Sequence, residues 1–232
     1  MCGIVGYVGE KQAANFLIDG LTKLEYRGYD SAGIAVFDGE KINVAKSVGR
    51  LAALKEKIKN NTPEGVMGIG HTRWATHGRP SDVNSHPHTD CSGKFAIVHN
   101  GIIENFMSLK EELIAKGHKF VSETDTEVVA HLIEDVYEGD FVEAVNKVLN
   151  RIEGSYSLAF MCQDYPDTLI CTKKDNPLVI GLGEGENFIA SDIPAIIAYT
   201  RRTYIMNDGE IAVVKKDSIW VTDRKGNPII LQ

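Results

Sequence analysis

The chain has 232 residues, of which 43% are hydrophobic and 25% charged, and its formal net charge is −7 at pH 7. This length and composition are typical of a globular protein with a sizeable core, built as one large domain or two small ones. The acidic balance argues against a protein that binds duplex nucleic acid, because such proteins normally present a basic face.

The four cysteines, at positions 2, 91, 162 and 171, form no Cys-x-x-Cys pair. This spacing fits a reducing compartment and argues against a disulfide framework or a structural zinc knot. No apolar stretch approaches the roughly 18 residues of a membrane helix, and the N-terminus lacks the basic flank of a signal peptide. We therefore expect a cytoplasmic protein with no membrane partner.

The first half of the chain mixes predicted strands and helices. A strand is expected at 2–8, and the apolar residues within 11–24 recur on one face, as in an amphipathic helix. The dipeptide Asp38-Gly39 predicts a tight turn between strands at 33–38 and 41–47. A second helix follows at 51–60. Buried strands are expected at 66–70 and 95–99, separated by a polar, histidine-rich segment at 71–93.

The second half begins with three predicted helices, at 105–116, 126–137 and 141–152, and is rich in short strands from residue 155 onward. This order favours sheets covered by helices over alternating βαβ units. A long segment without regular structure inside a compact domain is usually functional, so we expect the functional site near 71–93.

The motif "HTRWATHG" at 71–78 is expected on a loop after a buried strand. The planar guanidinium of Arg73 matches a substrate carboxylate, and Trp74 could close over it. Taken alone, the motif favours the alternative, in which Arg73 pairs with a surface carboxylate and Trp74 fills the edge of the core.

The tripeptide "HNG" at 99–101 has two interpretations. Asn-Gly is typical of a two-residue hairpin turn, which the tripeptide alone favours. The alternative is an oxyanion hole, in which the Asn100 amide and the Gly101 N–H stabilise a tetrahedral intermediate.

The motif "SETDTE" at 122–127 also has two interpretations. Thr124 and Glu127 have the spacing of a helix capping box, which the motif alone favours. The alternative is that Asp125 binds a substrate ammonium group.

Two further patterns carry less information. The histidines at positions 71, 77, 86, 88 and 99 lack the spacing of a zinc hydrolase, so we expect no metal there. The glycine-rich "GLGEGE" at 181–186 does not open a helix, and we expect a turn there and no nucleotide site.

The opening "MCGIVG" places a thiol at position 2. If Met1 is removed, Cys2 carries both a nucleophile and a free α-amino group that can act as its base. Considered alone, Cys2 is more simply a small apolar residue at the start of a strand.

Taken together, "MCGI", "EYRGYDSAG" (25–33), "HTRWATHG", "NSHPH" (84–88), "VHNGIIEN" (98–105) and "SETDTE" resemble the glutaminase domain of the class II glutamine amidotransferases. These proteins are N-terminal-nucleophile hydrolases. The resemblance implies an α+β fold, an αββα four-layer sandwich, over residues 1–232. It implies hydrolysis of L-glutamine to L-glutamate and ammonia through a thioester, with no cofactor and no metal.

The resemblance also implies roles for individual residues. Cys2 is expected to be the nucleophile, with Asn100 and Gly101 forming the oxyanion hole. Arg73 is expected to bind the α-carboxylate of glutamine and Asp125 its α-ammonium group. The remaining expected site residues are Trp74, Thr76 and His77 in a loop that closes over glutamine, and Arg27 and His86 as supports for the nucleophile region.

Within the family, the motifs most resemble members whose further sugar-isomerase domains use the ammonia to aminate fructose 6-phosphate. We therefore expect an excised glutaminase domain of a larger enzyme, itself a homo-oligomer. Three alternatives stay open: a domain that feeds a different acceptor, an inactive module that senses glutamine, and a metal-binding protein built on the histidines.

Overall fold

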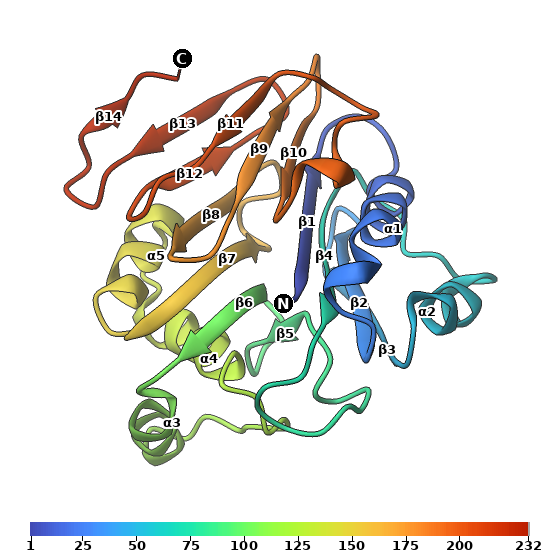
Figure 1. The fold of residues 1–232 in the computed structure, drawn as a ribbon. Helices are drawn as coiled ribbons and strands as arrows, with labels where there is room; N and C mark the ends of the chain where they lie inside the picture. Colours follow the sequence, from blue (N-terminus) through green and yellow to red (C-terminus); the bar gives the residue numbers. More distant parts are fainter. Residues whose placement is uncertain (232) are drawn as a thin grey trace.

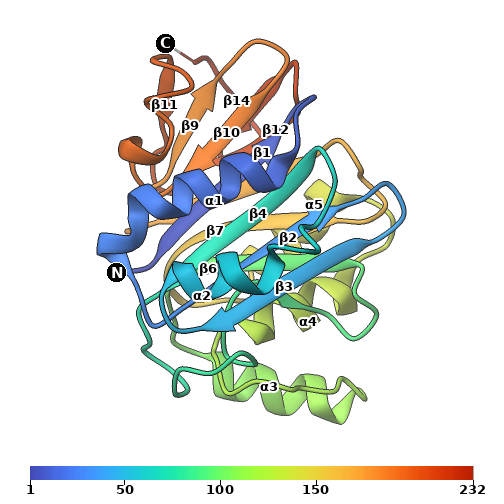
Figure 2. The same cartoon turned by 90° about the vertical axis from the view of Figure 1, so that its right-hand side faces the viewer.

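The computed structural model describes residues 1–231, which form two antiparallel sheets of seven strands each, packed face to face with helices on both outer surfaces (Figure 1). The side view shows α1 and α2 in front of one sheet and α4 and α5 behind the other (Figure 2). The expected αββα sandwich is therefore confirmed. None of the helices in residues 1–231 is long and apolar enough to cross a membrane.

The first sheet has the strand order β11-β9-β10-β1-β4-β2-β3. Its strands are β1 (Gly3–Val8), β2 (Ser31–Phe37), β3 (Ile42–Val48), β4 (Met67–Arg73), β9 (Val179–Leu182), β10 (Asn187–Ala190) and β11 (Thr203–Ile205). The second sheet has the order β14-β13-β12-β8-β7-β6-β5. Its strands are β5 (His88–Thr89), β6 (Phe95–Ile103), β7 (Gly154–Cys162), β8 (Leu169–Lys174), β12 (Ile211–Val214), β13 (Ile219–Thr222) and β14 (Pro228–Ile229).

The two faces of each central strand enter different cores. In β1, Ile4 and Val8 pack between the sheets, whereas Val5 and Tyr7 pack under α1. This alternation follows from the two-residue period of a strand, and it explains why β1 is a continuous apolar run. A strand buried on both faces is a rigid support for residues at its ends.

The helices have the predicted order and nearly the predicted ends. On the first sheet lie α1 (Ala13–Leu24) and α2 (Leu51–Ile58); α4 (Glu127–Val136) and α5 (Phe141–Leu149) cover the second, and α3 (Phe106–Ala115) packs on α4. Asp140 begins α5 by accepting a hydrogen bond from the Glu143 N–H at 2.9 Å. Gly117, with φ of +98°, follows the end of α3.

Two short turns match their predictions. Asp38 and Gly39 connect β2 to β3, and the Asp38 carboxylate accepts the N–H groups of Glu40 and Lys41. Residues 183–186 of the glycine-rich motif connect β9 to β10.

Three local predictions are wrong. Asn100 and Gly101 are not a hairpin turn, because both lie inside β6 and pair with Ser157 and Tyr156 of β7. Arg73 is not on a loop but is the last residue of β4.

The third wrong prediction is the capping box at Thr124 and Glu127. Helix α4 begins at Glu127 with Thr126 as its N-cap residue. The Glu127 carboxylate accepts the N–H groups of Val121 and Ser122 at 2.8 and 2.7 Å, and Thr124 does not cap the helix.

Candidate active site

The N-terminus lies between the two sheets, at the start of β1 and beside β6 (Figure 1). Cys2 immediately precedes β1 and is half-buried, whereas Met1 is 68% exposed. The Cys2 Sγ accepts the Trp74 N–H at 3.3 Å and lies 3.6 Å from the Trp74 carbonyl oxygen. Burial raises the pKa of the Cys2 thiol, and the bond from Trp74 opposes that rise. The thiol is therefore protonated at neutral pH and needs a base to become a nucleophile.

Two side chains hold the backbone of Cys2. The Arg27 Nε donates to the Cys2 carbonyl oxygen at 3.0 Å, and the Asn100 Nδ2 donates to the same oxygen at 3.2 Å. The Cys2 N–H donates in turn to the Asn100 Oδ1 at 3.4 Å. Since an amide NH₂ carries two hydrogens, Asn100 keeps one donor for another acceptor. These contacts bring the start of β1 against the middle of β6, on the facing sheet.

Gly101, the other expected oxyanion donor, lines the same pocket as Cys2. Its φ is +129°, and a Cβ on it would lie 2.2 Å from the Ser155 carbonyl oxygen. Only glycine fits this conformation and this space.

Arg73 and Asp125 supply opposite charges to the pocket, and both are almost fully buried. The Arg73 guanidinium donates to the carbonyl oxygens of His77, Gly78 (2.8 Å) and Arg79 (3.4 Å). Burial lowers its pKa, whereas the charges of Asp30, Cys2 and Asp125 raise it. In this arrangement the loop that follows β4 accepts three hydrogen bonds from the five N–H donors of the guanidinium, including both donors of Nη2. A ligand carboxylate that bonds to Nη2 has to displace that loop.

Asp125 is held by one of its two carboxylate oxygens. The Oδ2 accepts the Ile103 N–H at 2.8 Å, and the Oδ1 faces the Nδ1 of His77 at 3.9 Å. The second oxygen is therefore available to a cationic group in the pocket.

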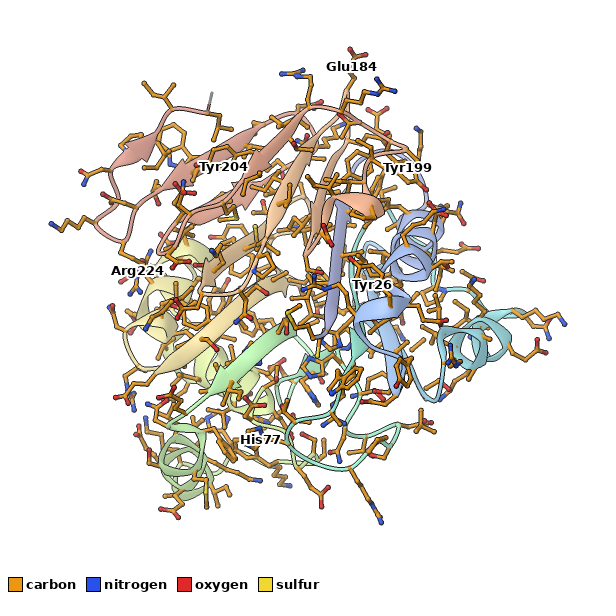
Figure 3. The ribbon with its side chains drawn as sticks, viewed as in Figure 1. Tyr26, His77, Glu184, Tyr199, Tyr204 and Arg224 are labelled. Atoms are coloured by element: carbon orange, nitrogen blue, oxygen red, sulfur yellow. The ribbon has the colours of Figure 1, made fainter. Side chains whose placement is uncertain are left out.

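The loop after β4 covers the pocket. Trp74 is 49% exposed and its ring meets Tyr29 edge-on, while Thr76 is exposed. The His77 ring packs edge-on against Phe106 at the start of α3, and Figure 3 shows His77 at the end of the molecule where this loop lies. Asp30, which precedes β2, holds the first residues of the loop: its carboxylate accepts the Ala75 N–H, and its own N–H donates to the Arg73 carbonyl at 3.1 Å.

The pocket is nearly closed in this arrangement, with about 10 Å³ accessible to the centre of a water molecule. Nearly all the expected site residues line it; Arg27 and Asn100 are instead bonded to the backbone of Cys2. The lining residues are Cys2, Arg73, Trp74, Thr76, His77, His86, His99, Gly101, Thr124, Asp125 and Thr126.

Four buried histidines form the floor beneath this pocket. His86 stacks on His71 with ring centroids 3.9 Å apart, and its Nδ1 accepts the His99 N–H at 3.4 Å. His99 and His88 contact the hydroxyls of Thr126 and Thr124 at 2.9 and 3.0 Å. Burial lowers the pKa of all four, that of His71 to about 3. They are therefore neutral at neutral pH and bonded to the protein itself.

Four residues at the pocket were not predicted from the sequence as part of the site. His99, Thr124 and Thr126 line the pocket, and Asp30 fixes the loop, although all four lie within motifs that had been singled out. Their positions next to predicted site residues were the only signal. The direction in which a side chain points at the end of a strand cannot be predicted from the spacing of residue types along the sequence alone.

Comparisons with known proteins show similarity in sequence and in fold. The sequence profile of the family described as "Glutamine amidotransferase domain" matches residues 71–198. The chain is 59% identical over 229 residues to the glutamine–fructose-6-phosphate aminotransferase (isomerizing) of Caldanaerobacter subterraneus, and 52% identical to that of Clostridium tetani. In both cases the match covers 99% of this chain and 38% of the relative.

Solved structures of glutamine amidotransferases share the fold of this chain. The glutamine phosphoribosylpyrophosphate amidotransferase of Bacillus subtilis superimposes with a TM-score of 0.84 at 27% identity, over 98% of this chain and 50% of that one. A class-II glutamine aminotransferase domain protein from Silicibacter pomeroyi superimposes with a TM-score of 0.65 at 14% identity, over 96% and 99%. The second likeness shows a shared fold only.

Proposed function

This chain belongs to the glutamine amidotransferase family, and from that membership we propose that it hydrolyses L-glutamine to L-glutamate and ammonia, with Cys2 as the nucleophile. The observation that carries the proposal is the convergence of three groups on one pocket: a thiol at the second residue, a buried guanidinium and a buried carboxylate. Arg73 and Asp125 match the carboxylate and the ammonium group of an α-amino acid. Cys2 then faces the rest of the substrate.

Removal of Met1 supplies the base. The backbone nitrogen of Cys2, which contacts the Asn100 Oδ1, then becomes an α-amine about 3 Å from the sulfur of the same residue. An α-amine has an ordinary pKa near 7.7–8.0, so roughly a tenth to a sixth of it is neutral at pH 7. This is suitable for a general base, since proton transfer is most efficient when the pKa lies near the working pH.

The reaction then proceeds in two halves. The amine takes the thiol proton, the sulfur attacks the side-chain carbonyl, and the oxyanion is stabilised by the free Asn100 N–H and the Gly101 N–H. The protonated amine gives its proton to the departing ammonia, which leaves a γ-glutamyl thioester on Cys2. Water, deprotonated by the same amine, hydrolyses the thioester and releases glutamate.

The loop after β4 controls entry of the substrate. Because its carbonyl groups accept both Nη2 donors of Arg73, binding of the glutamine α-carboxylate at Nη2 exchanges those bonds for bonds to the substrate. Trp74, Thr76 and His77 then close over the ligand. Arg27 holds the Cys2 carbonyl, and His86 supports the floor beneath the site.

The chain spans 38% of the length of the curated relatives to which it is similar. The name of these relatives supports fructose 6-phosphate as the acceptor of the ammonia. We propose that the acceptor binds in sugar-isomerase domains joined to this one, in a homo-oligomeric cytoplasmic enzyme. By the same reasoning, a different acceptor or an inactive glutamine-sensing module is less well supported.

The test is to incubate the purified chain with glutamine and measure glutamate and ammonia. We expect equal amounts of both products, and no turnover by Cys2→Ala or by a form with extra residues before Cys2. Normal turnover by a form whose retained Met1 is verified by mass spectrometry would refute the amine mechanism. A processed chain that binds glutamine without hydrolysing it would favour the sensing module.

A further inference from the structure

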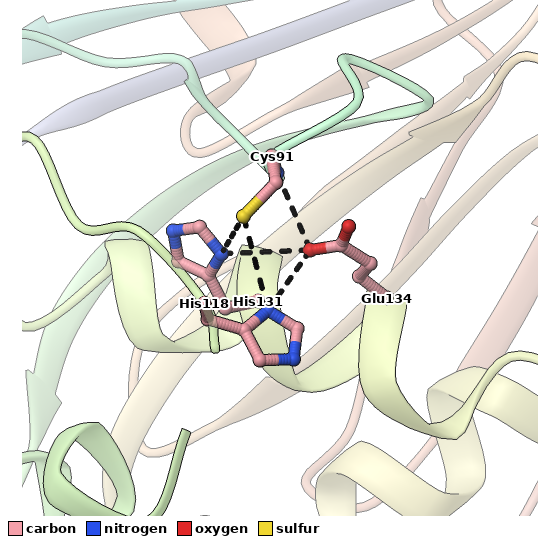
Figure 4. A group of neighbouring side chains, drawn as sticks. All are labelled: Cys91, His118, His131 and Glu134. Carbon is pink, nitrogen blue, oxygen red and sulfur yellow. Dashed lines mark hydrogen bonds and ion pairs between the residues drawn. The ribbon is translucent and has the colours of Figure 1, made fainter. Parts of the chain in front are cut away.

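A second cluster of reactive side chains lies outside the pocket, on three separate segments. Cys91 is in the turn between β5 and β6, His118 follows α3, and His131 and Glu134 lie on one face of α4. Figure 4 shows the Cys91 sulfur, both histidine Nδ1 atoms and the Glu134 carboxylate facing a common centre. None of the four residues lines the pocket at Cys2.

The distances between these atoms approach those of a tetrahedral metal site. The Cys91 Sγ lies 3.5 Å from the His131 Nδ1 and 4.0 Å from the His118 Nδ1. The Glu134 Oε2 lies 3.0 Å from the His118 Nδ1 and 3.5 Å from the His131 Nδ1. All four atoms lie within 4.8 Å of one another. In a tetrahedral zinc site with ordinary bond lengths, neighbouring ligand atoms are about 3.3–3.6 Å apart.

The histidines are also oriented as metal-binding histidines are. The other ring nitrogen of His131 lies 3.2 Å from the Glu127 Oε1, and that of His118 lies 3.6 Å from the Asp135 Oδ1. The His131 contact is within hydrogen-bond distance, whereas the His118 contact is an ion-pair distance. Ligating histidines almost always give their second N–H to a carboxylate, carbonyl or water, which leaves the first nitrogen unprotonated for the metal. The Lys119 N–H, which donates to the Cys91 Sγ at 3.4 Å, would further stabilise a thiolate.

We propose that Cys91, His118, His131 and Glu134 form a structural zinc site. One thiolate, two imidazoles and one carboxylate are the donors Zn²⁺ prefers, whereas Mg²⁺ and Ca²⁺ prefer all-oxygen sites. Binding replaces the Cys91 S–H proton by a Zn–S bond and releases that proton to solvent. The thiolate and the carboxylate then balance the two charges of the ion.

The site would fasten the chain between α3 and α4 to the turn before β6. Glu127, which faces His131, also accepts the N–H groups of Val121 and Ser122. The Glu127 carboxylate thus links the ligand His131 to residues 121 and 122, and the chain continues from there to Asp125. The inference concerns metal binding alone and does not depend on the proposed glutaminase activity.

The first test uses the wild-type chain. It is stripped with a chelator, titrated with Zn²⁺ and measured for bound metal, and Co²⁺ replaces Zn²⁺ in a parallel sample. We expect one zinc per chain, a sulfur-to-cobalt charge-transfer band, and no binding of Mg²⁺. At a zinc concentration a hundred times the Kd, the unfolding midpoint should rise by about 5–10 °C.

Variants identify the ligands. Cys91→Ser and His118→Ala should abolish the cobalt band, and Glu127→Gln should weaken zinc binding about 10- to 100-fold while keeping the stoichiometry. Two controls should bind zinc as the wild type does: Cys2→Ser removes the half-buried thiol outside the cluster, and Glu111→Gln neutralises an exposed carboxylate on α3.

Substoichiometric zinc in the wild type, or equal zinc in the wild type and in Cys91→Ser, would overturn the proposal. The cluster would then be held by hydrogen bonds and ion pairs alone. The wild-type titration decides the question even if a variant does not fold.

Discussion

Replacing Asp125 with asparagine removes one charge from the pocket and leaves the local structure in place. The Asp125 Oδ2 accepts the Ile103 N–H at 2.8 Å, and the amide oxygen of an asparagine can accept the same bond. What the variant lacks is the negative charge, which in the wild type is available to a substrate ammonium group through the second oxygen, Oδ1. Removing one member of a buried, hydrogen-bonded charge pair costs 2–5 kcal/mol. A loss of about 3 kcal/mol corresponds to about 150-fold in kcat/KM.

The assay compares glutamine with glutaramate, which has the same amide and carboxylate but no α-ammonium group. Glutamate or glutarate release is followed for both substrates with the wild type and with Asp125→Asn. The wild type should favour glutamine by about 150-fold, and the variant should lose most of that preference. An unchanged unfolding midpoint excludes a folding defect.

The reasoning fails if Asp125→Asn slows both substrates equally. Asp125 would then act on the structure around Ile103 and not on the ammonium group. An unchanged KM for glutamine would contradict it as well.

Three further predictions follow from the same structure. Asn100→Ala should lower kcat by about 10²–10³-fold with a smaller change in KM, because the lost donor acts on the oxyanion; steady-state kinetics that show only a KM change would contradict this. Gly101→Ala should destabilise the fold by several kcal/mol in urea unfolding, because its Cβ meets the Ser155 carbonyl; Gly117→Ala, at φ +98° in open space, is the matched control and should cost only about 1 kcal/mol. Burial holds the pKa of His71 at about 3 against an ordinary value of 6.5, so the unfolded chain binds the proton first as the pH falls. The contribution of neutral His71 to the free energy of unfolding is therefore fully present above about pH 6.5. It should fall by about 1 kcal/mol between pH 7 and 5.5. A free energy of unfolding that does not decrease over that range would refute this.

The helices and the order of the elements were predictable from the sequence because they depend on local patterns. The 3.6-residue period of α1 and the Asp-Gly turn after β2 are set by residues close together in the chain. Helix ends differ by at most three residues from the predictions, as expected where caps and packing compete.

The errors occurred where distant partners override a local preference. Asn100-Gly101 is a good turn sequence, but β7 pairs with both residues and continues the strand. Glu127 has capping-box spacing, but the backbone of Val121 and Ser122 takes its carboxylate instead. Local propensity is a weak guide wherever tertiary contacts decide.

The composition of the site came from a family resemblance and not from spacing. Cys2, Arg73 and Asp125 are far apart in the chain, and only the fold of two facing sheets brings them to one pocket. The cluster at Cys91 was missed for the same reason. Its four residues are separated by intervals of 27, 13 and 3, which match none of the short metal-binding motifs readable from a sequence.

The measurement that tests the central claim most directly is the intact mass of the purified chain before and after treatment with 6-diazo-5-oxo-L-norleucine, with glutamate release followed in parallel. The account predicts a chain that lacks Met1, one covalent adduct located on Cys2, and loss of glutamine hydrolysis in proportion to labelling. A processed chain that hydrolyses glutamine while Cys2 stays unlabelled, or that loses activity through an adduct at Cys91, would contradict it.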